Sequence, residues 1–366
     1  MKHIIISDTH SPTCIDKAYD YSTKVLKEHS DVDAIVINGD LLGIFSITES
    51  SLFRDKNIAK PELMKMLKRA APKFHSVYSN VKKVTSDMVY SYVEERYAWC
   101  LDVIAKFSEL KMTIFNLGNH ESEHHLLVLR ELPFLTNCTE SVLEDIDRSK
   151  LKLIVRNFER NLYALEAAGN FRYIKDKPIV IGSTLVMGIP GESHATAGED
   201  PLSKLQEKKT AELVELAKEH LANVDSIIIY NHTQGSYNKT TGSFWTASNS
   251  LSKFMSELPM NVMRRVFVQS HNHWSYSQFL YNAGFNFLLN NAGLHDGICN
   301  MVDFDMLKMN CYDLDPTHER ITPMKLSLTN VPVKEDDELI ARFYEDVNFI
   351  LKRKEIPAYL DALITL

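Results

Sequence analysis

The 366-residue sequence lacks the features of a membrane protein or of a disulfide-linked secreted domain. Its five cysteines are odd in number and scattered, without a Cys-x-x-Cys pair, so neither a disulfide framework nor a thiolate zinc site is expected. No apolar run approaches the roughly 20 residues that a membrane-spanning helix needs. The first residues enter a strand pattern without a signal-peptide pattern. We therefore expect a cytoplasmic protein.

An overall excess of basic residues is also missing. The formal net charge is -7, which argues against a surface that binds nucleic acid or anionic membranes throughout. Residues 54–83 are a local exception, with nine lysines and arginines against two acidic residues. Internal repeats and low-complexity segments are absent too. With 45% hydrophobic residues, the chain is suited to one large or two modest soluble domains with a substantial core.

Metal-type side chains follow the first two buried strands of the predicted fold. Asp8 and His10 end the first apolar run, and Asp40 ends the second, Asp33–Gly39. The helical pattern of Ile15–His29 between them predicts a βαβ crossover, which makes the two strands parallel. Carboxyl ends of parallel strands meet at one sheet edge, where α/β proteins bind ligands. We therefore expect Asp40 to lie beside Asp8.

The same arrangement recurs three times further along the chain. Asn119 and His120 follow a third apolar run, His232 follows a fourth, and His271 and His273 follow a fifth. Residues two apart on extended chain share a face, so the last two histidines can approach one ion. Each of these short sequences also occurs in ordinary turns. Their recurrence at five strand ends predicts one shared metal site.

In order and spacing, these motifs resemble those of the calcineurin-like metallophosphoesterase superfamily. The motifs are Asp-x-His, Gly-Asp, Gly-Asn-His-Glu, a lone strand-end His and a terminal His-x-His, and together they cover roughly residues 1–305. The resemblance implies the α/β class, as a four-layer α/β/β/α sandwich of two mixed sheets with a two-metal site between their carboxyl ends. The implied metal ligands are Asp8, His10, Asp40, Asn119, His232, His271 and His273.

The resemblance also implies how these ligands are shared between two ions. Asp8, His10 and His273 would hold one ion, and Asn119, His232 and His271 the other, with Asp40 bridging both. Mixed His, Asp and Asn ligands suit two divalent ions, for which we expect Mn²⁺, with Zn²⁺ or Fe as alternatives. The sequence departs from the family pattern at Gly43, where Asp or Asn is frequent, and at Ser270, where Gly is usual.

The remaining acid of the expected site is His120. It adjoins Asn119 and need not itself bind metal. As an imidazolium it could protonate the leaving oxygen or stabilise the transition state. For Glu121, two interpretations stay open: it orients His120, or it lies exposed to solvent.

The expected organisation is one metallophosphoesterase domain, residues 1–330, with a helical, locally basic insertion at about 44–110. Residues 331–366 are expected to form a helical extension packed on the domain. Within the insertion, the pattern predicts separate helices at Val81–Tyr92 and Glu94–Phe107. Residues 139–175 receive no role.

Two segments near the carboxyl end of the domain carry further predictions. Thr233–Ser250, rich in Gly, Ser, Thr and Asn, predicts a long functional loop. The strand patterns Ile298–Phe304 and Leu307–Leu314 predict antiparallel strands that close the second sheet.

The substrate class is a phosphate ester, and two features favour a nucleotide or nucleic-acid phosphodiester. The basic residues 54–83 are interleaved with Phe74, His75 and Tyr78, a combination that can contact phosphates and stack on bases. Aromatic residues also lie within Tyr237–Trp245. The alternatives are a phosphomonoesterase acting on a small molecule or phosphoprotein, and a catalytically silent metal-binding scaffold. The basic segment is equally well explained as a solvated helical face, and the oligomeric state is left open.

Overall fold

A computed structural model describes the parts of the chain that form two sheets and the helices covering them. The described residues are 1–9, 12–41, 68–69, 72–73, 76, 85–118, 120–121, 146–191, 201–232, 235–238, 243–246, 248–270, 278–280, 287–290, 298–305 and 308–313. The expected extension 331–366 and most of the basic segment lie outside them.

The first sheet, sheet A, has six strands and contains the amino terminus of the chain. Its central strands are parallel and two antiparallel strands are added at one side, so the sheet is mixed. In spatial order the strands are β14 (Lys308–Asp313), β13 (Ile298–Asp303), β1 (Lys2–Ile6), β2 (Ala34–Asn38), β3 (Thr113–Asn116) and β4 (Phe171–Tyr173).

The second sheet, sheet B, also has six strands and is mixed. Four parallel strands form its centre, and each outermost strand is antiparallel to its neighbour. In spatial order the strands are β11 (Gln278–Leu280), β12 (Phe287–Asn290), β10 (Arg264–Gln269), β7 (Ser226–Asn231), β6 (Thr184–Ile189) and β5 (Ile179–Ile181). Strands β5 and β6 form a hairpin at one edge of the sheet, with Gly182 at φ 60° in its turn.

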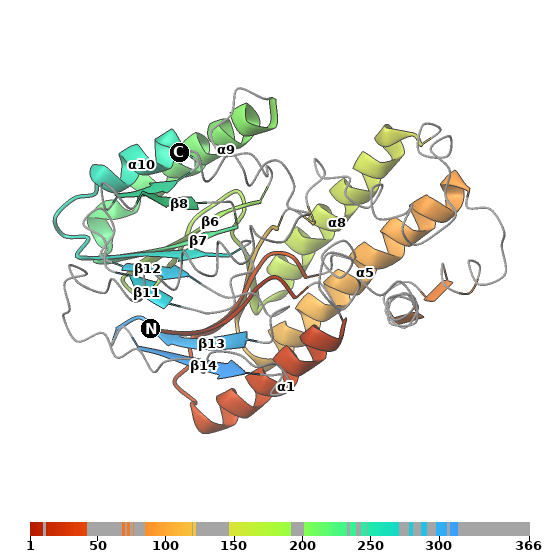
Figure 1. The fold of residues 1–366 in the computed structure, drawn as a ribbon, viewed down its shortest axis with the longest axis horizontal. Coiled ribbons are helices and arrows are strands. Elements are labelled where there is room, and N and C mark those ends of the chain that lie inside the picture. The colour runs from red at the N-terminus through yellow and green to blue at the C-terminus, as the bar shows by residue number, and fades with distance from the viewer. Residues whose placement is uncertain are drawn as a thin grey trace, which may run out of the picture.

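Helices cover the outer face of each sheet, and Figure 1 shows α1 and α5 on one side of the molecule with α9 and α10 on the other. Those on sheet A are α1 (Pro12–Glu28), α5 (Ser86–Leu110) and α8 (Arg148–Ala168); those on sheet B are α9 (Pro201–Lys218) and α10 (Asn249–Ser256).

Three separate apolar cores establish the order of layers. One joins sheet A to its helices and a second joins sheet B to its helices, while a third lies between the sheets. Ile4 and Ile6 of β1 belong to the outer core and Ile5 to the inner one, as the alternation of a strand requires. The α/β fold class, a four-layer α/β/β/α sandwich of two mixed sheets, is confirmed.

Local sequence signals explain where several helices begin. The Thr85 side chain caps α5 by accepting a hydrogen bond from the backbone nitrogen of Met88. The Asp147 side chain caps α8 by accepting one from the backbone nitrogen of Ser149. Such side chains satisfy backbone N–H groups that the first helical turn leaves open. Gly169, at φ 148°, ends α8.

Three expectations about single elements need correction. One continuous helix, α5, replaces the two helices expected at Val81–Tyr92 and Glu94–Phe107, and Val93 is buried within it. The segment 139–175, left without a role, supplies α8 and β4. Strands β13 and β14 extend sheet A beside β1, instead of closing sheet B.

The third correction concerns the expected loop at Thr233–Ser250. It contains the two-stranded antiparallel sheet of β8 (Gly235–Asn238) and β9 (Ser243–Thr246), followed by the start of α10. Among the described helices, none is both long and apolar enough to cross a membrane.

Candidate metal centre

Asp8 and Asp40 adopt an unusual backbone conformation at the carboxyl ends of β1 and β2. Their φ angles are 49° and 55°, in the left-handed region that non-glycine residues rarely adopt. The two turns are joined by hydrogen bonds, from Asp8 N to the Gly39 carbonyl at 3.1 Å and from Thr9 N to the Asp40 carbonyl at 2.9 Å. Backbone strain of this kind clusters at functional sites.

Asp8, Asp40 and His232 form a compact buried group that could hold a metal ion. One ligand atom from each side chain lies within 4.8 Å of the others, and all three residues are at most 1% exposed. The His232 Nε2 atom is 3.1 Å from Asp40 Oδ2 and 3.9 Å from Asp8 Oδ1. The carboxylates come from sheet A and the imidazole from the end of β7 in sheet B, so both sheets contribute to the group.

The orientation of His232 suits metal binding. Its Nδ1 lies 2.6 Å from the carbonyl oxygen of Asn38, which accepts only, so Nδ1 carries the hydrogen. The Nε2 atom is therefore the one that faces the two carboxylates. A carbonyl that fixes the tautomer in this way is a common second partner of a metal-bound histidine.

The electrostatics of the group favour a cation. Burial alone would lower the pKa of His232, but Asp40, Asp8 and the Asn38 carbonyl raise it to about 10. A positive charge at Nε2 is thus stabilised by two buried carboxylates, and a divalent ion bound there would meet the same favourable field. The donor set of two carboxylates and one imidazole fits Mn²⁺, Zn²⁺ or Fe.

His120 lies beside this group. It is 6% exposed, and its Nε2 atom is 4.0 Å from Asp40 Oδ2. Its backbone nitrogen donates to Asp40 Oδ1 at 3.0 Å, and its carbonyl accepts a hydrogen bond from Arg96 on α5 at 3.2 Å. The main chain of His120 therefore supports Asp40, while the ring is close to it without a direct hydrogen bond.

The structure contradicts one of the two interpretations of Glu121 and adds a role that the sequence did not predict. Glu121 is 1% exposed, so the expectation of a solvent-exposed glutamate is wrong. Its carboxylate accepts hydrogen bonds from backbone nitrogens of two separate turns: Asp40 at 2.9 Å, Leu41 at 2.9 Å and Gly118 at 3.0 Å. Burial and the nearby Asp40 carboxylate raise the pKa of Glu121. Glu121 thus links the ends of β2 and β3.

Two glycines allow the turns to approach each other closely. A Cβ atom on Gly39 would lie 2.5 Å from Gly118 Cα and 2.6 Å from His232 Nδ1. One on Gly118 would lie 2.2 Å from Asp40 Oδ1. Any side chain at either position would displace the carboxylate or the imidazole of the group.

Four of the predicted ligands lie outside the described residues: His10, Asn119, His271 and His273. Their assignment stays a prediction. Ser270, which departs from the family pattern, is 1% exposed, and its hydroxyl oxygen accepts a hydrogen bond from Asn38 at 2.8 Å.

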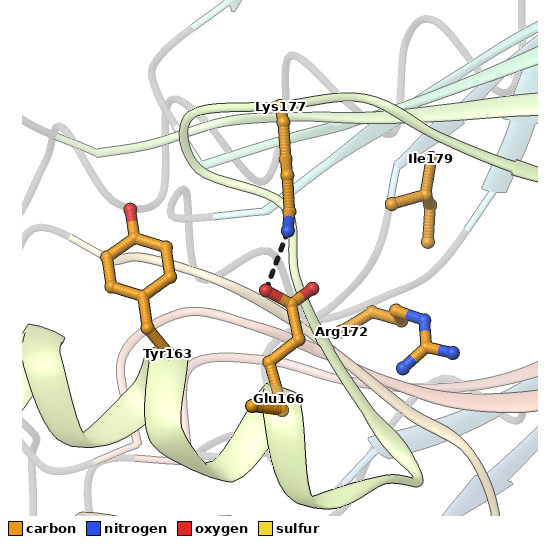
Figure 2. Close-up of a pocket in the computed structure, with 6 residues that line it drawn as sticks. Tyr163, Glu166, Arg172, Lys177 and Ile179 are labelled. Atoms are coloured by element: carbon orange, nitrogen blue, oxygen red, sulfur yellow. Dashed lines mark hydrogen bonds and ion pairs between the residues drawn. The ribbon is translucent and has the colours of Figure 1, made fainter.

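A pocket of about 490 Å³ lies away from this group, between the end of α8, β4 and β5 (Figure 2). Figure 2 shows Glu166 and Lys177 facing each other across it, joined by an ion pair of 2.8 Å. Arg172 donates to the backbone carbonyls of Gly169 and Phe171. Among the described residues that line this pocket, none is predicted for the metal site, so the pocket is separate from that site.

Comparisons with known proteins place the chain beside solved structures at low similarity. No protein-family model and no curated protein sequence matches it. Over 86% of its length it is similar to TT1561 of Thermus thermophilus, with 11% identity, a TM-score of 0.42 and 99% of that chain covered.

Two further solved structures carry functional names. A dimetal phosphatase from Danio rerio is 9% identical, with 85% of this chain and 95% of that chain covered and a TM-score of 0.39. A 5′-nucleotidase precursor from Thermus thermophilus is 11% identical, with 86% and 54% covered and a TM-score of 0.37. The function proposed below rests on this chain's own residues.

Proposed function

We propose that the protein is a hydrolase that uses two divalent metal ions to cleave phosphate esters. The observation that carries the proposal is the convergence of Asp8, Asp40 and His232, fully buried, from three strands and two sheets. Two buried carboxylates beside an imidazole of fixed tautomer are costly without a cation. Their position at the carboxyl ends of parallel strands is where α/β proteins bind ligands.

Within this proposal, the seven predicted ligands keep the roles that the family resemblance implies. Asp40 would bridge the two ions, and Asp8 and His232 would each bind one of them. Bound ions of this kind act as Lewis acids toward phosphoryl oxygens and lower the pKa of a water nucleophile. The expected preference is Mn²⁺, with Zn²⁺ or Fe as alternatives.

The chain's own groups account for the remaining steps. Glu121 holds the backbone of Asp40 in place, and Asn38 holds His232 with Nε2 facing the carboxylates. His120 would carry a proton on its ring and transfer it to the oxygen that leaves phosphorus. Its Nε2 atom lies 4.0 Å from Asp40 Oδ2, which supports this role because it places the ring beside the predicted bridging ligand.

For the substrate we propose a phosphodiester of a nucleotide or nucleic acid, on the basis of the basic segment 54–83. A direct test compares bis-p-nitrophenyl phosphate with p-nitrophenyl phosphate after chelation and addition of Mn²⁺. Faster cleavage of the diester is expected. Faster cleavage of the monoester would favour a phosphomonoesterase. Mn²⁺ binding without cleavage of either compound would indicate a silent scaffold.

A further inference from the structure

A pair of buried asparagines joins the two sheets directly beneath the candidate metal centre. Asn38 and Asn116 are the last residues of β2 and β3, and they lie opposite each other in the strand register. Both are 0% exposed. The Asn116 Nδ2 atom donates to Asn38 Oδ1 at 2.8 Å, so the two side chains form one connected unit.

This unit reaches across the inner core to sheet B. Asn116 Nδ2 is 3.0 Å from the Ile189 carbonyl of β6 and 3.1 Å from the Tyr230 carbonyl of β7. Asn38 Nδ2 donates to the Asn231 carbonyl at 3.2 Å and to the Ser270 hydroxyl oxygen at 2.8 Å. These acceptors lie at the carboxyl ends of three neighbouring strands of sheet B. Those in β6 and β7 belong to the strands themselves, and Ser270 directly follows β10.

The rest of the contact between the sheets is mostly apolar and therefore sets their relative position less sharply. The inner core contains side chains such as Val36, Ile114, Ile228 and Val268. Dispersion and burial of apolar surface are non-directional, whereas hydrogen bonds require defined distances and angles. A buried asparagine can fix the register of two packed elements in this way, as it does in coiled coils.

The placement of the two sheets matters because the candidate metal centre is divided between them. Asp8 and Asp40 belong to sheet A and His232 to sheet B, and the distance of 3.1 Å between Asp40 and His232 spans the gap. Asn38 is two residues before Asp40, and its carbonyl also binds His232 Nδ1. Asp40 is thus connected to the asparagine pair through two residues of backbone, and His232 is connected to it through one hydrogen bond.

We propose that Asn38 and Asn116 are positioning residues that lock the carboxyl ends of the two sheets together and so set the geometry of the metal centre. They would act through the ligands and would touch neither metal nor substrate. The inference rests on the proposed function, since it assigns these residues a role in that site. Gly188 supports the inference. A Cβ atom at this position would lie 2.6 Å from Asn116 Oδ1, so only glycine avoids a steric clash with the asparagine side chain.

The test uses Asn116→Asp, which keeps the shape of the side chain and removes its N–H donors. Tyr230→Phe is the matched control, because it removes a different polar contact between the sheets, the 2.5 Å hydrogen bond between the Tyr230 hydroxyl and His3 Nδ1. His3 lies five residues from Asp8, near the opposite end of β1. The readouts are Mn²⁺ affinity by calorimetry, melting temperature, and amide hydrogen exchange of residues 229–232 in metal-free protein.

We expect Asn116→Asp to weaken Mn²⁺ binding by about 10–100-fold, the usual effect of changing an outer partner of a metal ligand. Exchange at residues 229–232 should accelerate, while Tyr230→Phe leaves Mn²⁺ affinity unchanged. If Asn116→Asp does not fold, Ser270→Ala takes its place, removing one acceptor of the same network, with a smaller loss of affinity expected.

The outcomes separate this inference from the proposed function. Wild-type protein that binds no Mn²⁺ contradicts the proposed function. In that case, amide hydrogen exchange of residues 229–232 in metal-free wild type and Asn116→Asp still tests whether the asparagine pair positions the two sheets. Wild-type protein that binds Mn²⁺, together with unchanged affinity in Asn116→Asp or Ser270→Ala, overturns the inference alone. An equal loss of Mn²⁺ affinity in Tyr230→Phe also overturns the inference. Any weakening of the contact between the sheets would then reduce Mn²⁺ binding, and the asparagine pair would have no special role.

Discussion

The carboxylate of Glu121 accepts a hydrogen bond from the backbone nitrogen of Asp40 at 2.9 Å, across 81 residues of sequence. The same side chain binds Leu41 and Gly118, so one buried group connects the turns after β2 and β3. Tyr97 of α5 in turn donates its hydroxyl hydrogen to the Glu121 carbonyl at 3.1 Å. The position of Asp40 in the candidate metal centre therefore depends on a residue outside the predicted set of ligands.

Glu121→Gln should destabilise the protein by about 1–3 kcal/mol, because one amide NH₂ would then face a backbone N–H in a buried site. Mn²⁺ affinity should fall with it. Urea unfolding of metal-free protein measures the first effect and calorimetry the second. Glu94→Gln, at an exposed position of α5, is the control and should change neither. Unaltered stability of Glu121→Gln would contradict the linking role.

Gly39→Ala should damage the site far more than Gly182→Ala. Both glycines have positive φ, 79° and 60°, so alanine strains the backbone at each by about 1–2 kcal/mol. Only at Gly39 would the new methyl group also collide, with Gly118 and with His232. Such overpacking adds about 1–3 kcal/mol. Equal losses of unfolding free energy and equal Mn²⁺ affinities in the two variants would show that crowding is unimportant.

His120→Ala should retain Mn²⁺ and lose turnover by about 10²–10⁴-fold, the usual contribution of a general acid. Metal binding is expected to survive because the hydrogen bond to Asp40 comes from the backbone nitrogen of residue 120. Asp40→Ala should lose Mn²⁺ and turnover together. Metal content and steady-state kinetics measure both effects, with His29→Ala, directly after α1, as a neutral control. Undiminished turnover in His120→Ala would remove it from the catalytic role.

His3 should make the fold sensitive to acid. Burial lowers the pKa of His3 to about 3, and the charged amino terminus adds to the effect. The unfolded chain, with an ordinary histidine pKa near 6.5, binds the proton more readily, so stability is complete above pH 6.5 and declines below it. At pH 5.5 the loss from this residue should be about 1.4 kcal/mol relative to pH 7.5.

Urea unfolding at the two pH values measures this loss, with His3→Gln as the comparison. The variant keeps a polar group near Tyr230 but cannot titrate, so its stability should change less between the two pH values. The same pH dependence in both proteins would assign the acid sensitivity to other groups.

Much of the fold could be predicted because strands and helices leave local patterns. The apolar runs before Asp8, Asp40, His232 and Ser270 are buried strands. Local sequence patterns did not predict the secondary structure or pairing of segments that depend on contacts far apart in the sequence. Helix α8 packs against α5, and β13 pairs with β1, and neither partner is close in sequence.

The sequence by itself determined which residue types end the strands and in what order, and hence the candidate chemistry. Asp8, Asp40 and His232 meet as that order predicts. Only the tertiary structure decided that Glu121 is buried and that Asn38 binds across to sheet B. The physical reason is that a strand buried on both faces leaves a continuous apolar run, which can be read locally. A hydrogen bond between layers depends on how two sheets pack, and no local pattern records that.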